Sequence, residues 1–454
     1  MKLGIIILAA GAGTRMRSSI PKILHSLAGK PLLTHVYEVA NQLDSTGIHI
    51  IYGHGGNRVK ESLQHLDANW IEQSEQLGTG HAVAQALPAL KNNENVLVLY
   101  GDVPLISVHT LQQLIGHADQ QQLGLLTAQV DEPSGYGRIV RNDKGQVQSI
   151  VEEKDASEDQ RTIKEINTGI MVLPVNHLTR WINGLENKNV QKEYYLTDVI
   201  AMAVNDGIKI NTVSATTNME ISGVNDRIQL AQLERFYQEQ RASDLMKDGV
   251  TLFDPQRFDL RGSLKHGHDI VIDVNVIIEG EVSLGDGVQI GPNTVIKNST
   301  IGNGVKLMAN CVIEDAVMGD ECRIGPFARI RPETTLADHV HVGNFVEIKK
   351  SKVSTGSKIN HLSYVGDSSV GSEVNIGAGT ITCNYDGAKK HHTTIGNKVF
   401  IGSDTQLIAP VTVGDGATIG AGSTITRDVP ADALTLSRSP QKTRAGWQRP
   451  VKKK

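Results

Sequence analysis

The chain has few aromatic residues and few cysteines. Aromatic side chains make up 4% of its 454 residues, and Cys311, Cys322 and Cys383 show no spacing typical of a metal site. An odd number of cysteines does not suit a disulfide framework, so a reducing cytoplasmic setting is expected. The low aromatic content suits a core that has room for aliphatic side chains only.

Long hydrophobic runs and a strong excess of one charge are also missing. The first apolar run, Leu3–Ala10, is too short for the core of a signal peptide or for a membrane span. The formal net charge of −4 gives no indication of a nucleic-acid partner, and the basic end at 449–454 is most simply a solvated tail. We therefore expect a cytoplasmic protein of more than one domain, without a membrane or nucleic-acid partner.

What the chain does contain is a six-residue repeat. From Ile395 to Ile425 an aliphatic residue occupies every sixth position, and the period extends back to Ile272 with a few five-residue steps. This period is typical of a parallel β-solenoid with three short strands per coil, in which aliphatics point inward and small residues take the corners. We predict a left-handed parallel β-helix of hexapeptide repeats over 250–430, a loop extruded from one corner at 382–394, and a C-terminal arm at 431–454.

The front half has a different sequence pattern, in which buried strands alternate with helical segments. Leu3–Leu8, His49–Tyr52 and Val96–Tyr100 have the composition of buried parallel strands. Helical patterns such as Leu32–Leu43 and His81–Leu90 lie between them. The alternation predicts an α/β doubly wound, Rossmann-like domain over 1–227, followed by a helical linker at 228–249. Ligands of such sheets bind at the carboxyl ends of the strands.

The segment after the first predicted strand is rich in glycine and carries two cations. It runs Leu8-x-x-Gly11-x-Gly13-Thr14-Arg15-Met16, with Pro21-Lys22 shortly after. Glycines let the backbone approach a phosphate, and Arg15 and Lys22 would add positive charge for a polyphosphate. A glycine-rich turn alone is also consistent with an ordinary strand-to-helix connection. The whole string is narrower and resembles the signature of the sugar-nucleotide pyrophosphorylases.

Two further positions are candidates for a metal site or for local caps. Asp102 follows the predicted strand Val96–Tyr100 after one glycine. A carboxylate at such a strand end that faces a triphosphate is a natural Mg²⁺ ligand. Asp102 would otherwise be a turn residue before Pro104. On residue type alone, Asn225 or Asp226 is a helix N-cap ahead of the helical segment 227–247.

The predicted solenoid places residues 18 positions apart on one face. Arg331 and Lys349 have this spacing and each follows an inward aliphatic, so they should stack on the outside. Two stacked cations repel unless an anion joins them, and a substrate phosphate or the nearby Glu347 would serve. His361 is a candidate base near neutrality. Because Lys349 and His361 are 12 positions apart with one five-residue step between them, they fall near different faces of the prism.

Taken together and in this order, the motifs closely resemble a family of bifunctional bacterial enzymes over essentially the whole chain. These enzymes combine N-acetylglucosamine-1-phosphate uridyltransferase with glucosamine-1-phosphate acetyltransferase. The resemblance implies acetylation of glucosamine 1-phosphate with acetyl-CoA, then transfer of uridylyl from UTP to N-acetylglucosamine 1-phosphate with release of pyrophosphate. It implies supply of UDP-N-acetylglucosamine for peptidoglycan and lipopolysaccharide. Similar hexapeptide acyltransferases have sites in clefts between subunits, so we expect a homotrimer.

The resemblance also implies roles for particular residues. The implied catalytic residues are His361, Arg15 and Lys22. The implied nucleotide-binding residues are Leu8, Ala9, Ala10, Gly11, Lys22, Gln73, Gly78, Thr79, Tyr100, Gly101 and Asp102. Those for the sugar of uridylyl transfer are Gly137, Glu152, Asn167 and Asn225, and those for Mg²⁺ are Asp102 and Asn225. Those for the amino-sugar phosphate are Arg331, Lys349, Tyr364 and Asn375. Those for acetyl-CoA are Ala378, Asn384, Tyr385, Ser403, Ala421 and Arg438.

Three other functions fit parts of the sequence. A monofunctional pyrophosphorylase would use the solenoid only for structure or regulation, but such a solenoid has no need of the Arg331 and Lys349 pair. A zinc hydratase would use histidines such as His339, His341 and His361 from adjacent subunits, and their spacing fits a three-histidine site poorly. A non-enzymatic scaffold has no use for the phosphate loop.

Overall fold

The computed structural model of the chain describes residues 2–11, 13–53 and 56–452. It divides into two compact units, residues 1–237 and 238–454. The boundary falls inside helix α8 (Arg227–Lys247), in the segment predicted as a helical linker. In the part of the chain that is described, no helix is long and apolar enough to cross a membrane.

The first unit is built on a sheet whose main strand order is β11-β7-β10-β6-β1-β4-β5. Strand β1 (Leu3–Ala9) is central and runs parallel to β4 (Gly47–Tyr52) on one side and to β6 (Asn95–Tyr100) on the other. Strand β5 (Asn69–Glu72) extends the parallel part beyond β4. This half of the sheet has the parallel arrangement that the buried apolar runs predict.

The other half of the sheet makes it mixed. Strand β10 (Glu165–Pro174) runs antiparallel to β6 and to β7 (Gln122–Gln129). Strand β11 (Lys209–Ser214) lies parallel to β7 at the edge. The antiparallel pair β8 (Arg138–Arg141) and β9 (Val147–Val151) joins β10. The hairpin and β10 bring the segments around Gly137, Glu152 and Asn167 together.

Helices cover both faces of this sheet. Successive residues of β1 point to opposite sides, so Ile5 and Ile7 belong to one core and Ile6 and Leu8 to the other. The helices that pack on the first core include α1 (Leu32–Ala40) and α4 (Val108–Gly116). Those on the second are α3 (Thr79–Ala86), α6 (Val175–Asn183) and α7 (Asp198–Asn205).

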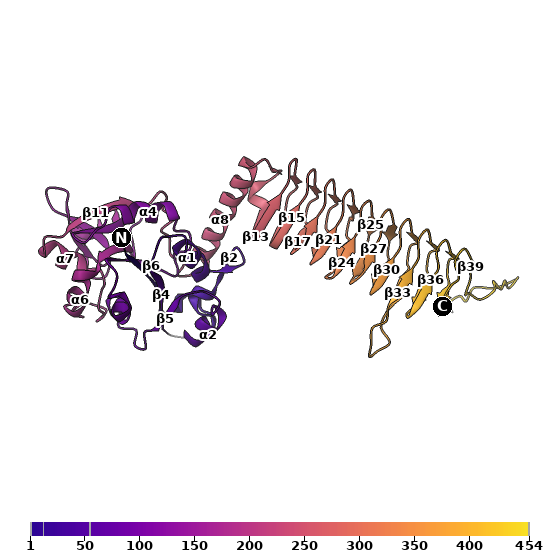
Figure 1. The fold of residues 1–454 in the computed structure, drawn as a ribbon, viewed down its shortest axis with the longest axis horizontal. Coiled ribbons are helices and arrows are strands. Elements are labelled where there is room, and N and C mark those ends of the chain that lie inside the picture. The colour runs from indigo at the N-terminus through magenta and orange to yellow at the C-terminus, as the bar shows by residue number, and fades with distance from the viewer. Residues whose placement is uncertain (1, 12, 54–55, 453–454) are drawn as a thin grey trace. The chain divides into compact units, whose positions relative to one another are not determined.

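The second unit is a three-sided prism of short parallel strands, which Figure 1 shows as successive coils. An 11-stranded sheet forms one face, and a 17-stranded sheet covers the other two. The register pairs residues one coil apart, so Ile330 lies opposite Ile348, and Ile348 lies opposite Val365. The inward aliphatics form one continuous buried core along the prism. The predicted solenoid is therefore confirmed.

Two kinds of residue turn the chain at the corners. Glycine follows an inward aliphatic where the next coil lies close, as at Gly402, where a Cβ would stand 2.5 Å from the backbone nitrogen of Ala421. Asparagine occupies a left-handed conformation at other corners, with φ of 59° at Asn275 and 58° at Asn293. The Asn275 side-chain amide donates to Asn293 Oδ1 at 2.9 Å. The sequence analysis predicted the small corner residues but not this asparagine ladder.

Two features depart from the regular coils. The loop between β32 (Ile381–Cys383) and β33 (Thr393–Ile395) projects from the prism where an extruded loop was predicted (Figure 1). Strand β39 (Leu434–Thr435) pairs with β37 (Thr418–Ile419), so the solenoid continues a few residues past 430. The residues from 438 to 452 are exposed.

Two candidate active sites

The first candidate site is a cavity of about 400 Å³ at the carboxyl ends of β1 and β6. It holds ten of the eleven residues expected to bind the nucleotide. Its lining is Leu8, Ala9, Ala10, Gly11, Lys22, Ile23, Gln73, Gln76, Gly78, Thr79, Ala82, Tyr100, Asp102 and Glu193. The eleventh, Gly101, supports the wall, because its backbone N–H donates to Leu8 O at 2.9 Å and joins the two strand ends.

Lys22, Asp102 and Asn225 meet at one edge of this cavity. The Lys22 ammonium donates to a carboxylate oxygen of Asp102 and lies 3.3 Å from Asn225 Oδ1. Asn225 lies next to Asp102 because the backbone N–H of the preceding Val224 donates to Asp102 O at 2.8 Å. The two oxygens thus already face a common cation. One carboxylate and one amide oxygen suit Mg²⁺, which takes oxygen ligands and keeps further positions for phosphates and water.

The neighbouring Asp226 performs the capping role considered for this pair of residues. Its Oδ1 accepts from the backbone N–H groups of Ile228 and Gln229, both at 2.9 Å, at the start of α8. The Asn225 side chain instead faces Lys22. The cap is therefore Asp226, and the metal-binding role of Asn225 stays a prediction.

Arg15 is not brought to this cavity. It lies exposed on the short 3-10 helix η1 (Thr14–Met16), and it does not belong to the lining within the described ranges. Lys22 is therefore the cation that the structure places beside the nucleotide-binding loop. Ala12, part of the same glycine-rich segment, lies outside the described residues.

A second cavity of about 290 Å³ adjoins the first and shares Thr79, Tyr100 and Glu193 with it. Gly137, Glu152 and Asn167 line it together. The Asn167 backbone N–H donates to Gly137 O at 2.8 Å, which ties the hairpin to β10.

The polar groups of this second cavity include residues that the sequence analysis missed. The Thr197 hydroxyl donates to Glu152 Oε1 at 3.0 Å, and Tyr195 also lines the wall. Burial raises the pKa of Glu152, and the charges of Asp198 and Asp155 raise it further against that hydrogen bond. A pair of tyrosines at 194–195 in a chain with 4% aromatics was the one available signal.

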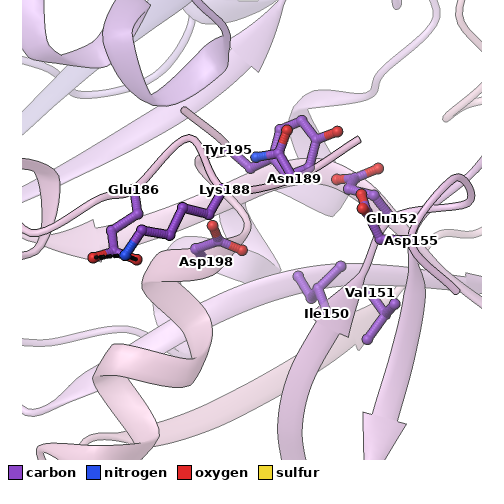
Figure 2. A pocket seen from close by; sticks show the side chains of 9 residues that line it. All are labelled: Ile150, Val151, Glu152, Asp155, Glu186, Lys188, Asn189, Tyr195 and Asp198. Atoms are coloured by element: carbon purple, nitrogen blue, oxygen red, sulfur yellow. Dashed lines mark hydrogen bonds and ion pairs between the residues drawn. The ribbon is translucent and has the colours of Figure 1, made fainter. Parts of the chain in front are cut away.

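Figure 2 shows a further cavity of about 320 Å³, which shares Glu152 and Tyr195 with the second cavity. The carboxylates of Glu152, Asp155 and Asp198 and the ring of Tyr195 line it, and Lys188 pairs with Glu186 at 3.1 Å. Burial and then the Asp155 charge raise the pKa of Asp198, and burial followed by the same charge raises that of Tyr195 to about 12. The carboxylates of Asp155 and Asp198 therefore lie near Glu152 and oppose its ionisation.

The second candidate site lies on the prism and begins with the predicted cation stack. In β23 (Arg329–Ile330) and β26 (Glu347–Lys349), Ile330 lies opposite Ile348, and the Arg331 backbone N–H donates to Ile348 O at 2.9 Å. Arg331 and Lys349 are therefore vertical neighbours on the outside. Each has a carboxylate partner: Arg331 Nη1 lies 2.7 Å from Glu347 Oε1, and Lys349 Nζ lies 3.5 Å from Asp367 Oδ2.

A third cation, Lys390, joins this stack from the extruded loop. Its ammonium lies 5.9 Å from the centre of the Tyr385 ring and beside the Lys349 ammonium. That contact, with the charges of Lys349 and Arg331, lowers the pKa of Lys390. Three cations around one space bind a phosphate favourably. The sequence analysis missed Lys390 because the loop interrupts the period, and the Lys389-Lys390 pair was its visible signal.

His361 lies on a different face from Lys349. It ends β28 (Lys358–His361) in the 11-stranded sheet, whereas β26 belongs to the 17-stranded sheet. His361 is exposed, and its Nδ1 is 3.1 Å from Oδ1 of Asn344 on the preceding coil. Since a carbonyl oxygen only accepts, Nδ1 is the donor in this contact, and in the neutral imidazole the lone pair is then on Nε2. Asn344 therefore orients the imidazole, a contact that the sequence analysis missed.

Tyr364 and Asn375 lie on the coils that follow. Tyr364 begins β29 (Tyr364–Gly366) and stacks on Glu347 in the register of the cation face. Its hydroxyl oxygen accepts from Asn384 Nδ2 at 3.4 Å. Asn375 lies in β31 (Asn375–Ile376), next to β28 on the face of His361. The residues expected to bind the amino-sugar phosphate are thus divided between two faces of the prism.

The residues expected at acetyl-CoA form a column along one corner and a flanking loop. The Ala378 carbonyl accepts from the Asp404 backbone N–H at 2.7 Å, and the Ser403 carbonyl accepts from Gly422 at 2.8 Å. Ala378, Ser403 and Ala421 are therefore successive steps of the same corner. Arg438 Nη1 donates to Ala421 O at 2.7 Å. Asn384 and Tyr385 lie at the next corner of the same coil, after β32, at the start of the extruded loop.

Comparison with protein families supports the division into two units. Residues 5–162 match the model of the MobA-like NTP transferase domain. Residues 261–354 match that of the GMPPB C-terminal domain, and residues 392–427 match six repeats of the bacterial transferase hexapeptide. The first match contains the strand ends that line the nucleotide cavity, and the last two lie within the prism.

Full-length relatives cover both units at once. The chain is 56% identical over 453 residues to a protein of Nitrosospira multiformis named Bifunctional protein GlmU, with 100% of this chain and 98% of the relative aligned. A protein of the same name from Marinobacter nauticus is 56% identical over 450 residues, and one from Aromatoleum aromaticum is 55% identical over 450 residues. Each of these two alignments covers 99% of both chains.

Proposed function

Because the chain belongs to the GlmU family of bifunctional transferases, we propose that its two candidate sites carry out the two successive reactions of UDP-N-acetylglucosamine synthesis. The prism acetylates glucosamine 1-phosphate with acetyl-CoA, and the first unit transfers uridylyl from UTP to N-acetylglucosamine 1-phosphate. The observation that carries this proposal is the gathering of Arg331, Lys349 and Lys390, since a structural solenoid needs no such anion site. It disfavours a monofunctional pyrophosphorylase.

In the acetylation reaction, the cation cluster holds the phosphate of the amino sugar. Nε2 of His361, held in place through Nδ1 by Asn344, takes a proton from the 2-amino group as its nitrogen attacks the thioester carbonyl. The new C–N bond replaces the C–S bond, and the proton can pass to the departing thiolate to give free CoA. The corner column of small residues at Ala378, Ser403 and Ala421 would hold the pantetheine arm, beside Arg438.

In the uridylyl-transfer reaction, the phosphate oxygen of N-acetylglucosamine 1-phosphate attacks the α-phosphorus of UTP and pyrophosphate leaves. The attacking oxygen is already an anion, so positioning and charge neutralisation are the main tasks of the protein. Lys22 neutralises phosphate charge at the edge of the nucleotide cavity. The adjoining cavity with Gly137, Glu152 and Asn167 holds the sugar hydroxyls, and Asn225 lies at the same edge as Lys22.

Nucleotidyltransferases of this family require a divalent metal. We assign Mg²⁺ to Asp102 and Asn225, because both offer oxygen and already share a cation in Lys22. When bound, the metal supplies charge for the triphosphate and for the pyrophosphate leaving group. In its absence the Lys22 ammonium neutralises the Asp102 carboxylate.

We also propose that the active acetyltransferase is a homotrimer. An exposed apolar ridge runs beside His361, made of Phe327, Phe345 and Leu362 with exposed fractions of 49%, 55% and 62%. The ridge is one corner of the prism, since the Phe345 backbone N–H donates to Phe327 O and that of Leu362 to Asn344 O. The two rings stack with centroids 5.3 Å apart. A second copy that covers this ridge would bring its own cation face to His361.

The proposal fits a cytoplasmic enzyme, because acetyl-CoA and UTP are cytoplasmic metabolites. It is tested by incubating the full chain with glucosamine 1-phosphate, acetyl-CoA, UTP and Mg²⁺ while free thiol and pyrophosphate are followed separately. Omission of UTP should stop pyrophosphate release but not thiol release. Omission of acetyl-CoA should stop both, and added N-acetylglucosamine 1-phosphate should then restore pyrophosphate release. Pyrophosphate release without any thiol release would instead indicate the monofunctional enzyme.

A further inference from the structure

A buried carboxylate connects the residues proposed for the two substrates of acetylation. Asp367 is 9% exposed and lies at a corner of the prism next to β29. One oxygen of its side chain lies 3.5 Å from Lys349 Nζ and also accepts a hydrogen bond from Asn384 Nδ2. Lys349 belongs to the proposed phosphate cluster, and Asn384 is one of the residues expected to bind acetyl-CoA. Asp367 is therefore the common partner of both.

The local backbone leaves room for this connection. Asp367 adopts a left-handed conformation with φ of 48°, which aspartate tolerates better than most residues. The preceding Gly366 has no side chain, and a Cβ there would collide with the Tyr364 hydroxyl and stand 2.8 Å from Asn384 Nδ2. Glycine at 366 thus permits Tyr364, Asn384 and Asp367 to pack together. The backbone N–H of Gly366 donates to Thr382 Oγ1 at 2.8 Å, which fixes the turn.

The charges around Asp367 require an anion. Arg331, Lys349 and Lys390 bring three positive charges together, and Glu347 neutralises the first of them. Without Asp367, Lys349 and Lys390 would repel each other with no buried counter-charge, and the Asn384 amide would lose its acceptor. Because Asn384 Nδ2 also lies 3.4 Å from the Tyr364 hydroxyl, its side-chain orientation affects both subsites.

We infer that Asp367 is the positioning residue of the acetyltransferase, which holds Lys349 for the amino-sugar phosphate and Asn384 for acetyl-CoA at the same time. This inference rests on the proposed acetylation of glucosamine 1-phosphate. Asp367 touches neither reacting atom in this arrangement and acts through its two neighbours. It makes binding of the two substrates depend on one side chain.

Two substitutions separate the two contacts. Asp367→Ala removes both, so the KM for glucosamine 1-phosphate and the KM for acetyl-CoA should each rise by about tenfold or more. Asp367→Asn keeps an oxygen that accepts from Asn384 but loses the charge that holds Lys349. It should therefore restore the KM for acetyl-CoA to within about threefold of the original value while the KM for the sugar phosphate stays high. A residue with a merely structural role would not divide the two constants in this way.

Asp315 offers a matched control on the same corner of the prism. It has the same side chain and a φ of 45°, and it is connected to Asp367 through the corner residues Glu333 and Lys350. It is exposed and contacts the Asn298 amide rather than a substrate residue. Asp315→Asn should leave both KM values unchanged. Thermal unfolding of each variant, compared with that of the unmodified chain, checks that the prism is folded.

The outcomes distinguish this inference from the proposed function. If the unmodified chain releases no thiol from acetyl-CoA and glucosamine 1-phosphate, the proposed acetylation fails. If the unmodified chain does release thiol, but Asp367→Asn changes neither KM or lowers the KM for the sugar phosphate, the inference alone fails. A lowered KM would mean that the carboxylate only competes with the phosphate for Lys349.

Discussion

In the first unit one ammonium, that of Lys22, lies between a carboxylate and an amide oxygen, whereas on the prism Arg331 and Lys349 each have a carboxylate of their own. The carboxylate beside Lys22 is also the proposed metal ligand. A substitution at Asp102 therefore affects the metal and Lys22 together, whereas a single substitution in the cluster on the prism removes only one charge. The first site should be sensitive to single substitutions, and the second should lose activity gradually unless its base is removed.

Replacement of the shared carboxylate should have the largest effect. Asp102→Ala removes the proposed metal ligand and the partner of Lys22, so pyrophosphate release should fall by about 10³-fold or more. Thiol release from acetyl-CoA should remain, because the prism contains its own site. Asp143→Ala, in the exposed turn between β8 and β9, is the control and should change neither reaction. Loss of both reactions in a folded Asp102 variant would contradict the independence of the sites.

Removal of the proposed base should reverse this pattern. His361→Ala should lower acetyl transfer by about 10²-fold, as expected for loss of a general base, and leave pyrophosphate release intact. Asn344→Ala should have a smaller effect of the same kind, since it frees the imidazole to rotate. His268→Ala changes another exposed histidine of the prism and should change neither reaction. Thiol and pyrophosphate assays on the three variants check this, and a fully active His361 variant would exclude the proposed base.

The apolar ridge tests whether the second site needs a partner chain. Phe345 has a φ of 55°, an unfavourable conformation for a large side chain, and Asn310 on the preceding part of this corner has a φ of 61°. Phe345→Asn should therefore fold well but lose the ring stack with Phe327. We expect sedimentation to show a monomer and acetyl transfer to fall by about tenfold or more, with uridylyl transfer unchanged. An active monomer would show that one chain holds the complete site.

A single cation of the cluster should matter less than the base. Lys390→Ala removes one of three positive charges, so the KM for glucosamine 1-phosphate should rise by about tenfold while the KM for acetyl-CoA changes little. Lys389→Ala, the exposed neighbour in the same loop, is the matched control. Equal effects of the two substitutions would indicate that the loop contributes only general charge. The measurement is steady-state thiol release at varied sugar phosphate.

The same contrast explains which features the sequence could predict. On the prism, a fixed number of residues per coil makes distant positions neighbours, so the stack of Arg331 on Lys349 followed from their spacing alone. The sequence did not predict Lys390, because the extruded loop has no period. It did not predict Asp367 either, because its importance depends on the loop residue Asn384.

In the first unit, the residues of the site have no regular spacing. Lys22 and Asp102 are 80 positions apart, and only their places after predicted parallel strands and the resemblance to a family suggested one site. The mixed sheet depends on the reversal at β10, for which the local pattern gave no sign. The partner Thr197 comes from the segment just before α7, 45 positions from Glu152, so no local pattern indicated their contact.

The smallest expected effect concerns the acidic surroundings of Glu152. Burial raises the pKa of its carboxyl above the ordinary value, so the folded unit favours the protonated form. A pKa that is raised by folding contributes stability below the ordinary carboxyl pKa, and this contribution is lost as pH rises through the raised value. Glu152→Gln keeps the shape without the charge, so its melting temperature relative to the unmodified chain should increase by a few degrees between pH 4 and pH 8. The transition of the first unit is identified by its shift with UTP. A difference that stays constant with pH would mean that folding does not raise the pKa of Glu152, and that neither burial nor the carboxylates around it oppose its charge.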